Sequence, residues 1–303
     1  MRMIPKTVLS FVCIAGILPA CSSSEPAETA RPNIVVTYSV LGSVVADLVG
    51  DAADVTTLIP DGQDPHDFQP SARDIEAINN ADLVVSNGLD FEEGLEDVLA
   101  SAIDSGVSVY MVGENITVRE PDEDLAKEDH AEEDGHAHGA GDPHLWLSPL
   151  SFSQALPSLT AAINKATGLS IDETAAIDQL TLLDNKINEV ISSISSCVLV
   201  SGHDEMGYFA DRYGCTVIGA IIPSFSTTSE ATAKQIADLK VLAESNNVKA
   251  VFTGLGTPAE VSEQLASELG IAAVSLSTLD LNGAANYREF MLNLANQIAE
   301  ALR

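Results

Sequence analysis

Two short segments repeat the tripeptide Asp-Pro-His together with its surroundings, and the shared histidine is the residue type best suited to chemistry. One segment reads DPHDFQP at 64–70 and the other DPHLWLSP at 142–149. In each, an aromatic residue stands two positions after the histidine and a proline follows. Neutral imidazole is the commonest metal ligand in proteins, so the repeat predicts that His66 and His144 bind one metal ion.

A third candidate ligand, His203, stands in VSGHDEMGYF, directly after a run typical of a buried strand. His66 also follows a predicted strand, and the proline before His66 and His144 restricts the backbone that carries each ring. Ligands bind at the carboxyl ends of strands in parallel α/β sheets, so the three histidines could converge on one cleft. A single histidine is more often an ordinary hydrogen-bonded residue, and it is the repeated surroundings that favour the metal interpretation.

The aspartate that opens each repeat, Asp64 or Asp142, has two possible roles. It can form an Asx turn with the backbone two residues on, or accept a hydrogen bond from the second ring nitrogen of a ligating histidine. Turn formation is the simpler expectation.

Runs typical of β-strands alternate with helical stretches along the chain. The predicted strands are 33–39, 54–60, 81–88 and 107–113, followed by 197–202, 215–220, 248–254 and 271–277. Strands that alternate with helices pair in parallel. We therefore expect an α/β fold of two similar lobes, 33–150 and 197–303, each with a mostly parallel sheet flanked by helices and connected through a helical region at 151–196.

One amphipathic helix is predicted within the connecting region, over 171–194. Ser170 and Glu173 have the spacing of a capping box. Apolar residues then recur at helical spacing on one face: Ala176, Leu180, Leu183, Ile187, Val190 and Ile194. Such a helix would join the lobes rigidly, so metal capture is expected to involve closure of local loops.

Residues 1–20 have the pattern of a secretory signal peptide. Arg2 and Lys6 precede an apolar run that is too short for the roughly 20 residues of a membrane span. The following LPAC resembles a bacterial lipobox, which predicts a lipid on Cys21 and a polar tether at 21–32. Plain secretion with a free cysteine is the alternative, and both place the chain outside the cytoplasm.

The net charge is strongly negative. Removal of Arg2 and Lys6 with the signal leaves 12 basic and 45 acidic residues, a net charge of −33. This charge argues against nucleic acid and anionic lipid headgroups as partners and favours a cation. A salty environment would select the same composition, so the charge alone does not indicate function.

Cys197 and Cys215 remain after the signal and the anchor. They open two successive predicted strands that would lie side by side, and outside the cytoplasm such a pair can form a disulfide. Two separate buried thiols are the alternative.

These features together resemble the metal-specific substrate-binding lipoproteins of bacterial ABC importers for zinc and manganese, solute-binding protein family nine. The segments that carry the resemblance are the lipobox, PDGQDPHDFQPSARD, the acidic insert, DPHLWLSP and SGHDEMGYFADRYG. The resemblance covers nearly the whole mature chain. It implies two α/β lobes joined by one long helix, a single divalent metal in the cleft, delivery to an ABC permease in the cytoplasmic membrane, and no catalysis. We expect a monomer.

The resemblance also implies the ligand set. His66, His144 and His203 fall on the first three ligand positions of the family, and Glu205 stands near the third. The fourth ligand in many members is an aspartate of the last lobe, for which STLDLNG offers Asp280, with water as the alternative. Three imidazoles and one carboxylate suit zinc better than manganese or iron, which prefer more oxygen ligands.

The insert at 120–141 carries nine acidic residues from Glu120 to Asp134 and three histidines, His130, His136 and His138. The resemblance implies a metal-collecting loop near the cleft. Composition by itself indicates only a disordered, solvated segment.

Two other functions use the same residues. A zinc-dependent hydrolase would hold a water on the metal, with Glu205 as general base, and would turn over esters, peptides or phosphates. A surface adhesin or metal-buffering lipoprotein could share the scaffold, and its loss would leave growth under zinc limitation unchanged.

Overall fold

A computed structural model describes residues 31–120 and 141–303 of the chain. The predicted signal peptide, the lipidation site Cys21 and the histidines His130, His136 and His138 lie outside the described residues and stay predictions. Within the described ranges, no helix combines enough length with enough apolar character to cross a bilayer.

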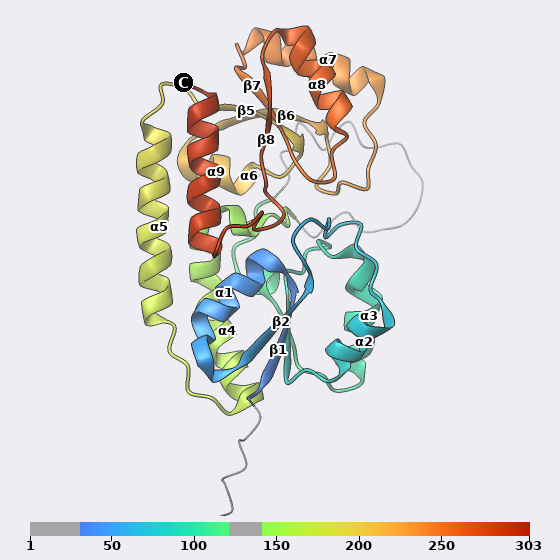
Figure 1. Cartoon of the computed structure of the whole chain (residues 1–303), viewed down its shortest axis with the longest axis vertical. Coiled ribbons are helices and arrows are strands. Elements are labelled where there is room, and N and C mark those ends of the chain that lie inside the picture. Colours follow the sequence, from blue (N-terminus) through green and yellow to red (C-terminus); the bar gives the residue numbers. More distant parts are fainter. Residues whose placement is uncertain (1–30, 121–140) are drawn as a thin grey trace, which may run out of the picture. The chain divides into compact units, whose positions relative to one another are not determined.

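The first lobe is built on a four-stranded parallel sheet in the order β2-β1-β3-β4 (Figure 1). Its strands are β1 (Asn33–Tyr38), β2 (Asp54–Ile59), β3 (Leu83–Ser86) and β4 (Val109–Met111). All four residues of the central strand β3 are buried, as expected where helices cover both faces of a parallel sheet. Helix α1 lies on one side of the sheet and helices α2 and α3 lie on the other (Figure 1). The helices of this lobe are α1 (Ser39–Val49), α2 (Ala72–Asn79) and α3 (Glu96–Asp104), with short 3₁₀ helices η1 (Gly50–Ala52), η2 (Glu93–Leu95) and η3 (Val112–Asn115).

The second lobe has two hydrogen-bonded parallel pairs, β5 with β6 and β7 with β8, and β5 lies beside β7. Its strands are β5 (Val198–His203), β6 (Thr216–Ile222), β7 (Ala250–Thr253) and β8 (Ala272–Ser275). Its helices are α6 (Gly207–Tyr213), α7 (Ala233–Ser245) and α8 (Ala259–Leu269). The expected α/β fold with a parallel sheet in each lobe is confirmed, and all eight predicted strands are present.

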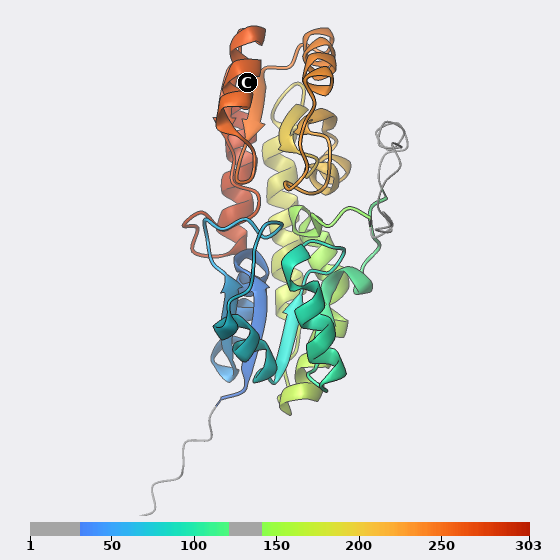
Figure 2. The same ribbon diagram turned by 90° about the vertical axis from the view of Figure 1, so that its right-hand side faces the viewer.

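Three long helices run beside the two lobes. They are α4 (Pro149–Thr167), which follows the 3₁₀ helix η4 (Leu145–Leu147), then α5 (Thr174–Ser192) and α9 (Tyr287–Ala301). Helix α5 packs against both α4 and α9, and Figures 1 and 2 show α5 extending from the first lobe to the second. Its buried residues include Leu180, Leu183 and Ile187, so the predicted apolar face is confirmed. At about 1.5 Å per residue, its 19 residues give a length of about 28 Å.

The predicted start of this helix is wrong. Helix α5 begins at Thr174, and Ser170 and Glu173 form no capping box. The side chain of Asp172 instead accepts a hydrogen bond from the backbone N–H of Thr174 at 2.8 Å. Capping boxes occur at α2 and α7, where Ser71 and Thr232 are the N-caps.

The reason for the late start is a contact with the preceding helix. The side chain of Asn164 in α4 accepts a hydrogen bond from the N–H of Ile171 at 2.7 Å and donates one to its carbonyl at 2.9 Å. Both backbone groups of Ile171 are therefore engaged by a side chain, which holds the segment before Asp172 outside the helix.

A single hydrophobic core links the lobes. It contains residues from the first sheet, from α4, α5 and α9, and from α6 in the second lobe, including Trp146, Phe152, Phe209 and Tyr287. A smaller core, which includes Val200 and Leu265, fills the space under α7 and α8. The described residues from 31 to 303 form one compact unit, in which the first lobe shares its core with part of the second lobe.

Cys197 and Cys215 are joined in a disulfide that closes a loop with a sequence separation of 18. They stand immediately before β5 and β6, which pair in parallel, and Thr216 N–H donates to the carbonyl of Cys197 at 2.8 Å.

We expect that replacing both cysteines, Cys197→Ser with Cys215→Ser, lowers the free energy of unfolding by about 3 kcal/mol, because a loop of this length loses its closure constraint in the unfolded chain. Urea unfolding of the oxidised wild type and of the variant measures the difference. Adding a reductant should destabilise the wild type and leave the variant unchanged. Equal urea midpoints for the oxidised wild type, the reduced wild type and the variant would contradict the prediction.

Candidate metal centre

The structure brings His66, His144 and His203 together. His66 lies in the turn after β2, His144 directly precedes η4, and His203 is the last residue of β5. All three are buried, and one ring nitrogen from each lies within 4.8 Å of the others. Two lobes and three separate chain segments therefore contribute to one small volume.

The spacing of the ring nitrogens suits a metal ion. Nε2 of His144 and Nε2 of His203 are 3.0 Å apart. A tetrahedral zinc ion with bonds of about 2.0–2.1 Å places its ligand nitrogens about 3.3–3.4 Å apart, which lies between this distance and the 4.8 Å limit of the group. Within the described part of the chain, neither ring nitrogen of His66 has a hydrogen-bond partner. Buried polar atoms are rarely left in this state, and coordination to a cation would satisfy one of them.

The surroundings favour the neutral form of two of the imidazoles, those of His66 and His203. Burial lowers the pKa of His66 and of His203 well below the usual histidine value, and the nearby His144 lowers both further. Neutral imidazole is the form that coordinates metal, so His66 and His203 are in the form suited to metal binding at neutral pH.

The repeated Asp-Pro-His motif forms the same turn twice. Oδ1 of Asp64 accepts a hydrogen bond from the N–H of His66 at 3.0 Å, and Oδ1 of Asp142 accepts one from the N–H of His144 at 3.0 Å. In both cases the aspartate closes an Asx turn and the intervening proline restricts the backbone. The repeat is thus a local turn that orients a histidine side chain.

The two aspartates differ in their remaining contacts. Oδ1 of Asp142 also lies 2.9 Å from Nδ1 of His144, so both roles considered for this aspartate are present. Oδ2 of Asp64 instead accepts a hydrogen bond from the hydroxyl of Thr227 in the second lobe at 2.7 Å. A carboxylate on one imidazole nitrogen fixes the ring and makes the other nitrogen a better ligand.

Glu205 occupies the corresponding place behind His203. Its Oε2 lies 3.5 Å from Nδ1 of His203, and burial raises the pKa of Glu205 to about 7. Both His144 and His203 therefore have a carboxyl group on the Nδ1 side, while their Nε2 atoms face each other.

Aromatic residues pack around the histidines. The ring of Phe91 makes an edge contact with His66 at 4.8 Å between centroids and lies 4.6 Å from Trp146. Trp146, the aromatic residue of the second repeat, is fully buried and donates its indole N–H to the carbonyl of Thr278 at 2.7 Å. These contacts exclude water and restrict ring rotation.

A buried polar network supports the second turn. Asn87 donates to the carbonyl of Pro143 at 2.9 Å and accepts from the hydroxyl of Tyr38 at 2.9 Å. The N–H of Asn87 donates to Glu92, which also accepts from Thr37. Burial raises the pKa of Glu92 to about 6. Sequence reasoning missed this network, because Asn87 and Glu92 stand in an ordinary loop and only their contacts mark them.

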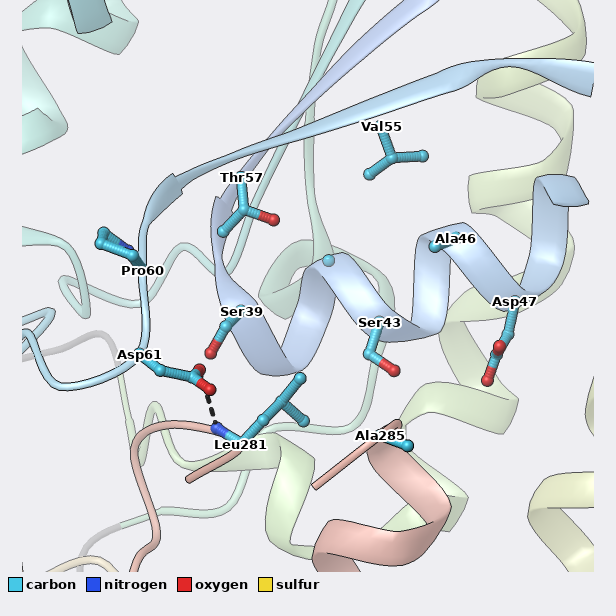
Figure 3. A pocket seen from close by; sticks show the side chains of 11 residues that line it. Ser39, Ser43, Ala46, Asp47, Val55, Thr57, Pro60, Asp61, Leu281 and Ala285 are labelled. Atoms are coloured by element: carbon cyan, nitrogen blue, oxygen red, sulfur yellow. Dashed lines mark hydrogen bonds between the residues drawn. The ribbon is translucent and has the colours of Figure 1, made fainter. Parts of the chain in front are cut away.

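Asp280 is not part of the histidine group. It is buried, its Oδ2 accepts a hydrogen bond from the N–H of Gly62 at 2.7 Å, and its other oxygen accepts from the hydroxyl of Ser277. Asp61 makes the reciprocal contact, accepting from the N–H of Leu281 at 3.2 Å (Figure 3). These carboxylates connect the turn after β2 to the loop before α9.

A pocket of about 500 Å³ lies next to this connection, lined by α1, β2 and the loop before α9 (Figure 3). Its polar lining includes Ser39, Ser43 and Asp47, and none of the three histidines contributes to it. The pocket and the histidine group are therefore separate features.

The fold and the three buried imidazoles define a two-lobed α/β protein with the geometry of a metal-binding centre. Residues 34–301 match the family described as zinc-uptake complex component A, periplasmic, and the chain belongs to this family. This agrees with the resemblance found in the sequence.

Similar proteins support the assignment. The zinc-binding protein AdcA of Streptococcus pyogenes serotype M3 is 29% identical over 267 residues, which cover 82% of this chain and 51% of AdcA. The chain thus spans about half the length of the streptococcal relatives. The high-affinity zinc uptake system protein ZnuA of Bacillus subtilis is 29% identical over 275 residues, which cover 87% of this chain and 85% of that protein.

Solved structures share the fold. The periplasmic zinc-binding protein TroA from Treponema pallidum is 23% identical, with a TM-score of 0.75 over 90% of this chain and 99% of TroA. The Mn-bound periplasmic metal-binding protein from Candidatus Liberibacter asiaticus is 17% identical, with a TM-score of 0.73 over 90% of this chain and 100% of that one.

We expect that Asn87→Ala lowers the free energy of unfolding by about 1–3 kcal/mol, because it leaves the hydroxyl of Tyr38 and the carbonyl of Pro143 without a partner in a buried site. Asn246→Ala is the matched control, since its side chain donates to an exposed helix end at Leu242. Chemical denaturation of both variants measures the effect; an equal loss in the two would contradict the role of Asn87.

Proposed function

We propose that the protein captures a single divalent transition metal, zinc, outside the cytoplasm and delivers it to an ABC-type permease in the cytoplasmic membrane. The observation that carries the proposal is the convergence of three buried imidazoles, one of which, His66, has no hydrogen-bond partner on either ring nitrogen within the described residues. Family membership, and the names of relatives that bind or take up zinc, support the same conclusion.

The proposed ligands are His66, His144 and His203, with Asp280 as the fourth. Asp280 reaches the metal only by giving up its contact with Gly62 or Ser277, and water is the alternative fourth ligand. Three nitrogen ligands favour zinc over manganese or iron, which bind better to sites with more oxygen.

The metal is cargo in this proposal, and the protein is not an enzyme. A hydrolase would need Glu205 to act on a metal-bound water. Glu205 lies against Nδ1 of His203, whereas Nε2 of that ring faces His144. This placement supports a role in orienting His203.

Capture is proposed to proceed by local loop movement. The shared hydrophobic core and helix α5 oppose a large change between the lobes. The loops that carry Asp64 and Thr227 come from different lobes, and the hydrogen bond between these two residues is a contact whose loss would cost little.

The location and assembly follow from the N-terminal sequence and the family. A signal peptide and a lipid on Cys21 would hold the protein at the outer face of the cytoplasmic membrane or in a periplasm, next to its permease. The family description, periplasmic, supports this location. The protein would act as a monomer, with the acidic segment containing His130, His136 and His138 collecting metal near the site.

We expect one zinc ion per chain in protein purified without added metal. His66→Ala, His144→Ala and His203→Ala should each weaken zinc binding by more than the roughly 10–100-fold that loss of a ligand's supporting partner costs. His136→Ala removes a histidine of the proposed collecting segment and no ligand of the cargo site, so it should keep one zinc ion per chain at equilibrium. Elemental analysis measures the stoichiometry and competition titration measures the affinity. Asp280→Asn tests whether aspartate or water is the fourth ligand. Wild-type stoichiometry and affinity in all three histidine variants would disprove the ligand set.

Growth of the source cell should depend on the protein when zinc is scarce. Deleting its gene should slow growth in chelated medium, and wild-type protein should restore growth, whereas the His66→Ala, His203→Ala double variant should not, because the cargo site is lost. Normal growth of the deletion strain would favour an adhesin. Turnover of p-nitrophenyl esters by the zinc-loaded protein would favour a hydrolase.

A further inference from the structure

Arg119 contacts both of the segments that carry His144 and His203. We propose that Arg119 is a positioning residue, which sets the spacing between these two histidines and so controls how fast the metal leaves. The inference rests on the proposed function, because it concerns the same metal.

On one side, Arg119 holds the turn before His144. Its carbonyl accepts a hydrogen bond from the N–H of Asp142 at 2.8 Å, and its Nη1 lies 3.6 Å from Oδ2 of Asp142. Asp142 is fully buried, and within the described residues its Oδ2 has no hydrogen-bond partner. A buried carboxylate needs a nearby positive charge, and the Arg119 guanidinium supplies one while Oδ1 stays on Nδ1 of His144.

On the other side, Arg119 holds helix α6, which begins four residues after His203. Its N–H donates to the hydroxyl of Tyr208 at 3.0 Å, and its Nε donates to Oδ2 of Asp211 at 2.9 Å. The guanidinium also packs on Gly207, where a Cβ atom would lie 2.6 Å from Cζ of Arg119. The glycine leaves the space in which the guanidinium sits.

Within the described residues, these contacts link Arg119 to both ligand-bearing segments through its backbone and its guanidinium. The first segment belongs to the first lobe and the second to the second lobe, so a single residue ties the two across the site. A metal site tolerates displacements of only about 0.5 Å, and a change in the distance between the two Nε2 atoms alters both bonds at once.

The test measures zinc release from the full protein. In Arg119→Met, zinc should still bind at one ion per chain, but a chromophoric chelator should remove it about 10–100-fold faster than from the wild type. Arg119→Lys should recover part of the loss, because lysine restores the charge without the planar guanidinium. With Co²⁺ in place of zinc, the d–d absorption bands should shift in Arg119→Met.

Arg31→Met is the matched control for charge. Arg31 forms an exposed ion pair with Asp54, away from the segments of His144 and His203. Its replacement therefore changes the net charge by the same amount as Arg119→Met. Its zinc release should match the wild type, which would exclude a long-range effect of charge.

Gly207→Ala separates positioning from stability. The added methyl group displaces the guanidinium while its charge is kept, and alanine is a better helix former than glycine, so the melting temperature should fall less than in Arg119→Met. Zinc release should nevertheless become faster. If the rate of zinc release in these variants simply followed their melting temperatures, Arg119 would have a merely structural role.

The outcomes separate the proposed function from the role of Arg119. A wild type that binds no zinc would overturn the proposed function. A wild type that binds one zinc ion, with unchanged release in both Arg119→Met and Gly207→Ala, would overturn only the role of Arg119. Should Arg119→Met fail to fold, Gly207→Ala decides the question.

Discussion

Three imidazole rings packed into one buried volume are the constraint on which the rest of the structure depends. Each brings polar nitrogen atoms away from water, and burial together with mutual proximity keeps His66 and His203 neutral. Burial of these polar atoms is unfavourable in free energy unless a bound cation compensates for it. The carboxylates of Asp142 and Glu205 and the ring of Phe91 prepare the histidines for that cation by limiting how they can turn.

The fold meets this constraint because the two lobes pack together as one rigid unit. Helices α4, α5 and α9 share a core with both sheets, so the ends of β2 and β5 keep a fixed relation although they belong to different lobes. Shorter links then act near the site itself: Asp64 with Thr227, Asp280 with Gly62, and Trp146 with Thr278. Precision at the histidines is thus a property of the whole packed structure.

Much of this could be predicted from residue patterns. Strands β1, β3, β5 and β7 were found because their apolar runs reflect burial on both faces of a parallel sheet. The predictions that failed also have physical causes. The capping box at Ser170 did not form because Asn164, in another helix, engages both backbone groups of Ile171. The roles of Asn87 and Arg119 were invisible, because each depends on partners that are distant along the chain.

The sequence by itself determined that histidines are the candidate ligands, that Asx turns carry His66 and His144, and that strands alternate with helices. These depend on contacts within a few residues or on periodicity, which a linear chain displays. Only the tertiary structure decided that Nε2 of His144 and Nε2 of His203 face each other, that Glu205 stands behind His203, and that Asp280 joins the lobes. Those outcomes depend on distances between residues from different segments, and packing of the whole chain sets such distances.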